Sequence, residues 1–166
     1  LDFCAGGGGK SLALSDRFSG TISAYDRDFL RMKDIPVRAE RSGVKIKLLS
    51  KEELGMVSTF DLVICDVPCT GSGAWRRNPE SKWTITSDYF EALKDTQQEI
   101  LDDASKLVNR DGVLVYMTCS LLKAENTDQI DAFLLRNSDW KVIFQESFPV
   151  SDSGDGFFVT HFKMSS

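Results

Sequence analysis

Short, continuous apolar runs alternate with helical patterns along this chain. The runs are rich in Val, Ile and aromatic residues, and most show little alternation of apolar and polar positions. Such runs are typical of strands that are buried on both faces. They lie at Thr21–Tyr25, Val44–Leu49, Phe60–Cys65, Val113–Thr118, Val142–Phe148 and Phe157–Phe162, and a shorter run, LDF, begins the chain.

Apolar residues at helical spacing predict helices between these strands. The clearest helix runs from about Ser87 to Asn109, and a second runs over Ala124–Asn137. A third helix is predicted over Arg27–Arg41, where we expect a kink or a break at Pro36 because proline disrupts a helix interior.

Alternating buried strands and helices predict an α/β fold with a Rossmann-like, doubly wound sheet. Only the segment SDSGDG separates the main parts of the last two strands, which is too short for a helical crossover, so these strands should pair antiparallel. A mostly parallel sheet with one antiparallel strand near the C-terminus is the pattern of class I methyltransferases. With 166 residues and no linker-like segment, the chain is expected to form one domain over residues 1–166.

Composition and charge narrow the possible functions. The chain carries 20 Lys and Arg against 25 Asp and Glu, and this balance argues against a protein that coats nucleic acid. This charge balance does not exclude an enzyme that acts on nucleic acid. No apolar run approaches the roughly 20 residues that span a bilayer, and no secretory signal precedes the first strand. We therefore expect a cytoplasmic monomer without a membrane partner. Because the chain begins at Leu1 inside an apolar run, we also expect it to be a fragment.

Four widely spaced cysteines and a single histidine argue against a zinc site and against a disulfide framework. No metal is expected. Each cysteine is then either a buried apolar residue or a reactive thiol, and its position along the predicted strands decides between these alternatives.

The segment LDFCAGGGGKS follows a predicted strand and opens a predicted helix. Consecutive glycines let backbone amides approach a ligand closely. A P-loop would need a glycine where Cys4 stands, and Gly6–Gly9 do not match the dinucleotide fingerprint. Two interpretations of the glycine turn remain: it binds a nucleotide cofactor derived from methionine, or it is a turn without a ligand. Asp26, about 20 residues further on, suits ribose hydroxyls and would equally suit the cap of the following helix.

Two of the cysteines follow strands at the edge of the sheet where ligands bind. Cys69 lies in the loop after the strand that begins at Phe60, and Cys119 follows the strand that begins at Val113. Cys65 lies within a strand and is assigned to the core, whereas Cys4 suits either packing or a cofactor site. A thiolate can add to the electron-poor carbon 6 of a pyrimidine, which makes carbon 5 nucleophilic toward a methyl group. A carboxyl at Asp66 could stabilise the charge that develops on the base.

Cations and aromatics alternate in the loop that follows. The segment AWRRNPESKW holds Arg76, Arg77 and Lys82 next to Trp75 and Trp83. Stacking combined with phosphate contacts is how proteins hold single-stranded or flipped bases, so we assign the three cations to RNA binding. A solvated loop with two packed tryptophans is the alternative.

These residues resemble the motifs of a known family, the RNA cytosine-5 methyltransferases of the Fmu/Sun group. The resemblance is carried by LDFCAGGGGKS, FDLVICDVPCTGSGAWRRNPESKW, DGVLVYMTCSLLKAEN and DGFFVTHFKM. It implies an S-adenosylmethionine-dependent enzyme that methylates carbon 5 of cytosine in RNA, with ribosomal RNA as the first expectation and transfer RNA as the second. It also implies that Cys119 is the nucleophile, that Cys69 assists release of the base, and that Asp66 contacts the cytosine. The implied cofactor-binding residues are Cys4, Ala5, Gly6, Gly7, Gly8, Gly9, Lys10, Asp26 and Asp66.

The chain also departs from that family. Gly6-Gly7 replaces Ala-Pro, and Ser50-Lys51 stands where the family places an acidic residue that contacts adenine, so the adenine contact stays unassigned. We expect the family's N-terminal RNA-binding region and the motif before the first strand to lie outside these 166 residues. Two alternative functions are a methyltransferase-like scaffold without catalysis and a P-loop nucleotide hydrolase. The retained cysteine pair argues against the scaffold, and Cys4 argues against the hydrolase.

Overall fold

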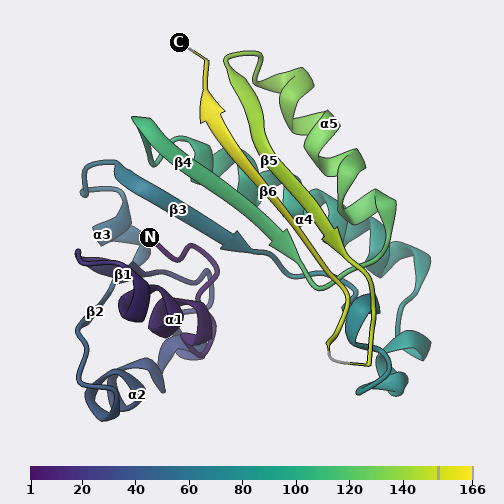
Figure 1. Ribbon diagram of the computed structural model, residues 1–166, viewed down its shortest axis with the longest axis horizontal. Coiled ribbons are helices and arrows are strands. Elements are labelled where there is room, and N and C mark those ends of the chain that lie inside the picture. The colour runs from purple at the N-terminus through teal and green to yellow at the C-terminus, as the bar shows by residue number, and fades with distance from the viewer. Residues whose placement is uncertain (153, 166) are drawn as a thin grey trace.

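A mostly parallel sheet forms the centre of the molecule (Figure 1). The computed structural model describes every residue except 153 and 166. β1 (Ile22–Ala24) pairs in parallel with β2 (Ile46–Leu48), and a second group of strands has the order β3-β4-β6-β5. Its members are β3 (Phe60–Asp66), β4 (Val108–Thr118), β5 (Trp140–Phe148) and β6 (Phe157–Met164).

The antiparallel strand is where the sequence predicts it. β6 lies between β4 and β5 and runs antiparallel to both, whereas β3 and β4 pair in parallel. The parallel pairing brings the carboxyl ends of β3 and β4 to the same edge. The loop after each strand therefore starts beside the other, and this edge is where the cysteines of interest were expected.

Helices cover both faces of the sheet. Figure 1 shows α4 behind the strands, α5 next to α4 at the side of β5, and α1 in front, beside β1. The α-helices are α1 (Gly9–Arg17), α2 (Ile35–Arg41), α3 (Lys51–Leu54), α4 (Ser87–Ser105) and α5 (Thr127–Arg136). Short 3-10 turns lie at Phe29–Met32, Ser72–Ala74, Pro79–Trp83 and Lys123–Glu125. The expected break of the third predicted helix is confirmed, because Pro36 lies in the first turn of α2, where a missing N–H costs nothing.

Two sequence-based boundaries were wrong. The helix expected to end at Asn109 ends at Ser105, because the buried Val108 pairs with Phe60 and the chain already runs as β4, across a bulge, before Gly112. The LDF run is not a strand of its own. Only Asp2 bridges both Ala24 and Ile64, which joins the two groups of strands.

The core lies between the sheet and α4 and α5. Its largest fully buried side chains include Tyr116, Phe158 and Phe162. Phe133 of α5 packs its ring edge-on against Phe162, with centroids 5.1 Å apart, and against Trp140 at 6.0 Å. Among the described residues, no helix has both the length and the apolar character that crossing a membrane requires.

Candidate active site

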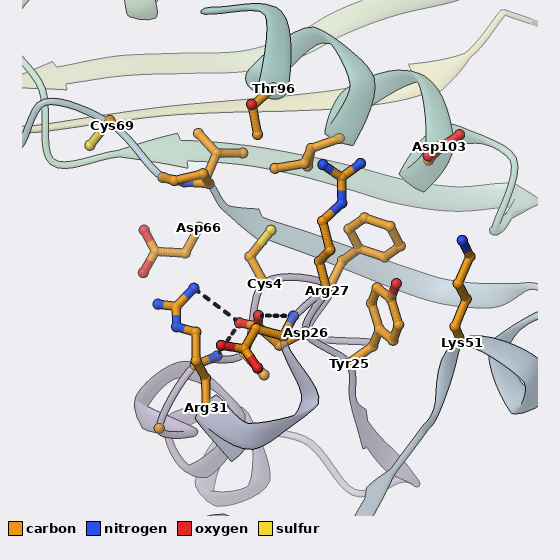
Figure 2. A pocket seen from close by; sticks show the side chains of 18 of the residues that line it. Cys4, Tyr25, Asp26, Arg27, Arg31, Lys51, Asp66, Cys69, Thr96 and Asp103 are labelled. Atoms are coloured by element: carbon orange, nitrogen blue, oxygen red, sulfur yellow. Dashed lines mark hydrogen bonds and ion pairs between the residues drawn. The ribbon is translucent and has the colours of Figure 1, made fainter. Parts of the chain in front are cut away.

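A cavity of about 920 Å³ opens at the carboxyl edge of the sheet (Figure 2). It lies where the glycine turn, β1, β3 and β4 end, with α4 along one side. The predicted residues that line it are Cys4, Ala5, Gly6, Gly7, Asp26, Asp66, Cys69 and Cys119.

Asp26, which follows β1, holds the glycine turn through a hydrogen bond. Its Oδ2 accepts a hydrogen bond from the Gly6 N–H at 2.9 Å and lies 3.4 Å from Nη1 of Arg31. Its Oδ1 accepts from the N–H of Asp28 at 3.0 Å. Figure 2 shows this carboxylate among its donors at the floor of the cavity. Asp26 therefore shapes the turn, in addition to the ribose contact that the resemblance implies.

The second half of the glycine turn lies outside the cavity lining. Gly8 has a φ of 79°, and a Cβ there would lie 2.7 Å from Cγ1 of Ile35, so the position needs glycine to pack against α2. Gly9 begins α1. Lys10 turns toward β3, where its Nζ lies 2.8 Å from Oδ2 of Asp66. The cofactor roles expected for Gly8, Gly9 and Lys10 stay predictions, and any such role for Lys10 passes through Asp66.

The two loop cysteines come into direct contact. The Sγ atoms of Cys69 and Cys119 lie 3.4 Å apart, and both residues line the cavity. All four cysteines of the chain are free thiols. Cys65 is fully buried, as its place within β3 predicts, while Cys4 is half-buried and points into the cavity in Figure 2.

The contact between the two sulfur atoms shifts the pKa values of Cys119 and Cys69 in opposite directions. Cys119 accepts a hydrogen bond from the Cys69 thiol, and this bond lowers the pKa of Cys119 to about 7, against the opposing effect of burial. The same bond and then burial raise the pKa of Cys69 well above that of an ordinary thiol. Burial also raises the pKa of Cys4 and of Cys65. Near neutral pH, the thiolate therefore forms first at Cys119.

Alkylation by iodoacetamide tests this assignment. A lowered pKa means that the Cys119 thiolate accumulates as pH rises and is complete at lower pH than usual. The alkylation rate of Cys119 should therefore rise with pH and level off just above a midpoint of about 7. Peptide mass spectrometry resolves the four thiols. Cys69→Ala should move the midpoint upward, and a midpoint at the ordinary thiol value of about 8.5 in the unaltered chain would contradict the assignment.

Several lining residues come from segments that the sequence analysis did not assign to the site. Thr96, Ile100 and Asp103 form one stripe of α4, at helical spacing, along the side of the cavity. The signal was present in the polar Thr96 and Asp103 on the same stripe, but only docking of α4 on the sheet shows what the stripe faces.

Charges of both signs line the end of the cavity that lies away from Cys69. Lys51, which stands where the related family has an acid, lines it, and Ser50 caps α3 through a reciprocal pair of hydrogen bonds with Glu53. Figure 2 shows Lys51 and Asp103 at one end, with Tyr25 and Arg27 between them and Asp26. This end offers the Asp103 carboxylate as an acceptor for an amino group such as that of adenine, the contact that the sequence left unassigned.

The cations expected to bind RNA lie on the loop after β3. Nε of Arg77 donates to Oδ2 of Asp155 at 2.8 Å, and Nη2 of Arg76 lies 4.0 Å from Oδ1 of the same residue. Lys82 lies over two rings, with its Nζ 5.9 Å from the centroid of Trp75 and 5.3 Å from that of Trp83. Trp83 is 80% exposed even with Lys82 over its ring, so much of the ring surface is accessible for stacking on a base.

Comparison with known proteins decides the family. A family model described as "16S rRNA methyltransferase RsmB/F" matches residues 1–163. The chain belongs to this RsmB/F family. It is 36% identical over 148 residues to ribosomal RNA small subunit methyltransferase B of Shewanella oneidensis, an alignment that covers 86% of this chain and 35% of that protein. The chain spans about two fifths or less of the curated relatives it matches.

Solved structures agree with the RsmB/F assignment. NSun6 from Pyrococcus horikoshii, solved with SFG, superposes with a TM-score of 0.83 at 26% identity and covers 99% of this chain and 47% of its own. A methyltransferase homologue from the same organism gives a TM-score of 0.77 at 26% identity, with 98% of this chain and 60% of its own covered. The predicted class I methyltransferase fold is thus confirmed.

Proposed function

We propose that this chain is the catalytic part of an S-adenosylmethionine-dependent enzyme that methylates carbon 5 of cytosine in RNA, with ribosomal RNA as the substrate. The observation that carries the proposal is the contact of 3.4 Å between two thiols in the cavity beside the glycine turn. Membership of the RsmB/F family and the names of its ribosomal relatives support the choice of RNA.

The residues of the cavity suit this cofactor. Phe3, Tyr25 and Ile100 supply apolar surface for a purine ring, and Asp26 and Asp103 supply acceptors for hydroxyl and amino groups. The lining also holds the cationic Arg27, Arg31 and Lys51 for a carboxylate. When bound, S-adenosylmethionine supplies an electrophilic methyl group. The volume of about 920 Å³ leaves room for a cofactor and a flipped base side by side.

The roles of the two cysteines in the reaction follow from where the proton between them lies: Cys119 is the thiolate and Cys69 holds the proton. The Cys119 thiolate adds to carbon 6 of cytosine, and the ring takes a proton from Cys69 as charge develops on it. Carbon 5 is then nucleophilic enough to accept the methyl group. In the free protein the hydrogen bond to Cys119 and then burial raise the pKa of Cys69, and burial remains after Cys119 has bonded to the base. Cys69, now a partly buried thiolate, takes the proton from carbon 5. The carbon–sulfur bond breaks, Cys119 leaves as the thiolate, and the ring loses its extra proton to solvent.

Asp66 holds the base in this scheme. It lies three residues before Cys69 at the end of β3, and the ammonium of Lys10 fixes one of its oxygens. The other oxygen stays available to accept a hydrogen bond from the base edge. Lys10 therefore acts as a positioning residue for Asp66.

The test is methylation by the full-length gene product. With methyl-labelled S-adenosylmethionine and small-subunit ribosomal RNA, nucleoside mass spectrometry should find the label in 5-methylcytidine. Transfer RNA serves as the competing substrate. Cofactor binding without any transfer to RNA would favour the scaffold alternative, and label on another atom or base would overturn the proposed chemistry.

Trp83 should contribute to RNA affinity. Because its exposed ring can stack on a base, Trp83→Ala should weaken binding of a short single-stranded RNA by about tenfold, measured by fluorescence anisotropy. Phe18→Ala removes another exposed aromatic ring at the end of α1 and should leave affinity unchanged. Equal affinities for the unaltered protein and the Trp83 variant would remove this residue from the RNA site.

A further inference from the structure

Two adjacent residues, Glu125 and Asn126, hold the backbone around both thiols. Both are buried, and neither lines the cavity. They lie in the turn between β4 and α5. The catalytic scheme above gives them no step, yet Glu125 is a carboxylate with 0% exposure, which is costly to bury unless its hydrogen bonds are specific and complete.

The Glu125 carboxylate joins the two cysteine loops. Its Oε1 accepts from the backbone N–H of Thr70 at 2.8 Å, and its Oε2 accepts from the Thr70 hydroxyl at 2.6 Å. Oε2 also accepts from the hydroxyl of Ser120. Thr70 directly follows Cys69, and Ser120 directly follows Cys119. A single side chain thus fixes the residue after each thiol.

A second buried side chain, Gln97, fixes the backbone on the other side of Cys69. Nε2 of Gln97, on α4, donates to Oε1 of Glu125 at 3.1 Å and to the carbonyl oxygen of Pro68 at 2.9 Å. Pro68 directly precedes Cys69. The backbone on both sides of this thiol is therefore tied to one network that also reaches Ser120.

Asn126 does the same for Cys119. Its Oδ1 accepts from the hydroxyl of Thr118 at 2.6 Å, and its Nδ2 donates to the carbonyl oxygen of Ser120 at 2.9 Å. The N–H of Ser120 also donates to the Thr118 hydroxyl at 3.1 Å. These contacts fix the residues before and after Cys119.

We infer that Glu125 is a positioning residue for methyl transfer, which sets the spacing between the sulfur atoms of Cys69 and Cys119. The carboxylate accepts four hydrogen bonds, and only a group without donors of its own can accept them all. A glutamine of the same shape would turn an N–H₂ toward one pair of donors, and the loop residues on that side would move. The catalytic meaning of this inference rests on the proposed function.

The test compares Glu125→Gln with the unaltered protein. The contact between the thiols is the source of the early alkylation of Cys119, so a looser contact should move its alkylation midpoint upward by at least about one pH unit. Alkylation at pH 7 should then be about fivefold slower. Diamide, which oxidises two neighbouring thiols to a disulfide while its azo group is reduced to a hydrazine, should link Cys69 to Cys119 less efficiently in the variant.

Asp128→Asn is the matched control. Asp128 lies at the start of α5 and pairs on the surface with Lys123 at 3.1 Å, so its neutralisation should change neither readout. A cooperatively unfolding Glu125→Gln protein with the unaltered midpoint and the unaltered disulfide yield would overturn the inference.

Replacing the hydroxyls that donate to Glu125 tests the same contact if Glu125→Gln does not fold. Thr70→Val removes one hydroxyl donor while leaving the carboxylate, and it should shift the Cys119 midpoint upward, whereas Thr70→Ser should restore it. No shift in Thr70→Val and in Ser120→Ala would overturn the inference. Because alkylation needs neither RNA nor cofactor, it gives a result even if the proposed methylation fails.

Discussion

Replacing Cys119 by alanine should abolish methylation of RNA, whereas replacing Cys69 should leave the enzyme covalently attached to its substrate. Without the Cys119 sulfur no bond forms at carbon 6, and carbon 5 never becomes nucleophilic, so the rate should fall by at least about a thousandfold. Without Cys69, solvent has to supply the ring proton, so addition and methyl transfer still occur, but more slowly. The carbon 5 proton then stays in place and the adduct cannot collapse.

Both outcomes are visible in one denaturing gel with labelled RNA. Cys69→Ala should show a slowly migrating protein–RNA band, and Cys119→Ala and the double variant should show none. Cys65→Ala controls for the loss of a sulfur from the core, because Cys65 is buried within β3 and does not line the cavity. Methylation by the Cys119 variant, or an adduct in the double variant, would exclude the assigned roles.

Replacing Gly73 by alanine should have the second-largest effect. A Cβ there would lie 2.3 Å from the carbonyl oxygen of Gly156 and 2.9 Å from that of Cys119. Both neighbours are backbone atoms, so relief requires the loops to separate. The N–H of Gly73 donates to the Cys119 oxygen at 2.9 Å, and the N–H of Gly156 donates to the Gly73 oxygen at 3.0 Å, so the Cys119 loop would move as well.

The expected changes are a free energy of unfolding lower by roughly 1–3 kcal/mol and methylation slower by about a hundredfold, because small displacements of reacting groups are costly. Urea unfolding and single-turnover methylation measure the two. Gly154→Ala is the control, since among the described residues outside its chain neighbours its Cβ would meet no atom within 4 Å. If Gly73→Ala were as active as Gly154→Ala, Gly73 would have no part in placing Cys119.

Much of the fold could be predicted from local pattern. Apolar runs identified the strands, and the short segment after Phe148 identified the antiparallel pair. The expected burial on both faces holds for β1 but is wrong for β5, because β5 lies at the edge of the sheet and its residues after Trp140 are exposed. The parallel arrangement then placed Cys69 and Cys119 at one edge. Boundaries failed where long-range contact outweighed local preference, as at Val108, whose burial against β3 extends β4 into a segment that reads as the end of a helix.

The chain's sequence by itself determined the kind of chemistry: a thiol in the loop after each of two strands, an aspartate at the end of one of these strands, and a glycine turn for a cofactor. Tertiary structure alone decided how those groups act on one another. The contact of 3.4 Å between the thiols, the pairing of Lys10 with Asp66 and the buried carboxylate of Glu125 all join residues that are far apart in the chain. Hydrogen bonds and proton sharing depend on tenths of an ångström, and only the packing of the loops against α4 and the turn before α5 sets such distances.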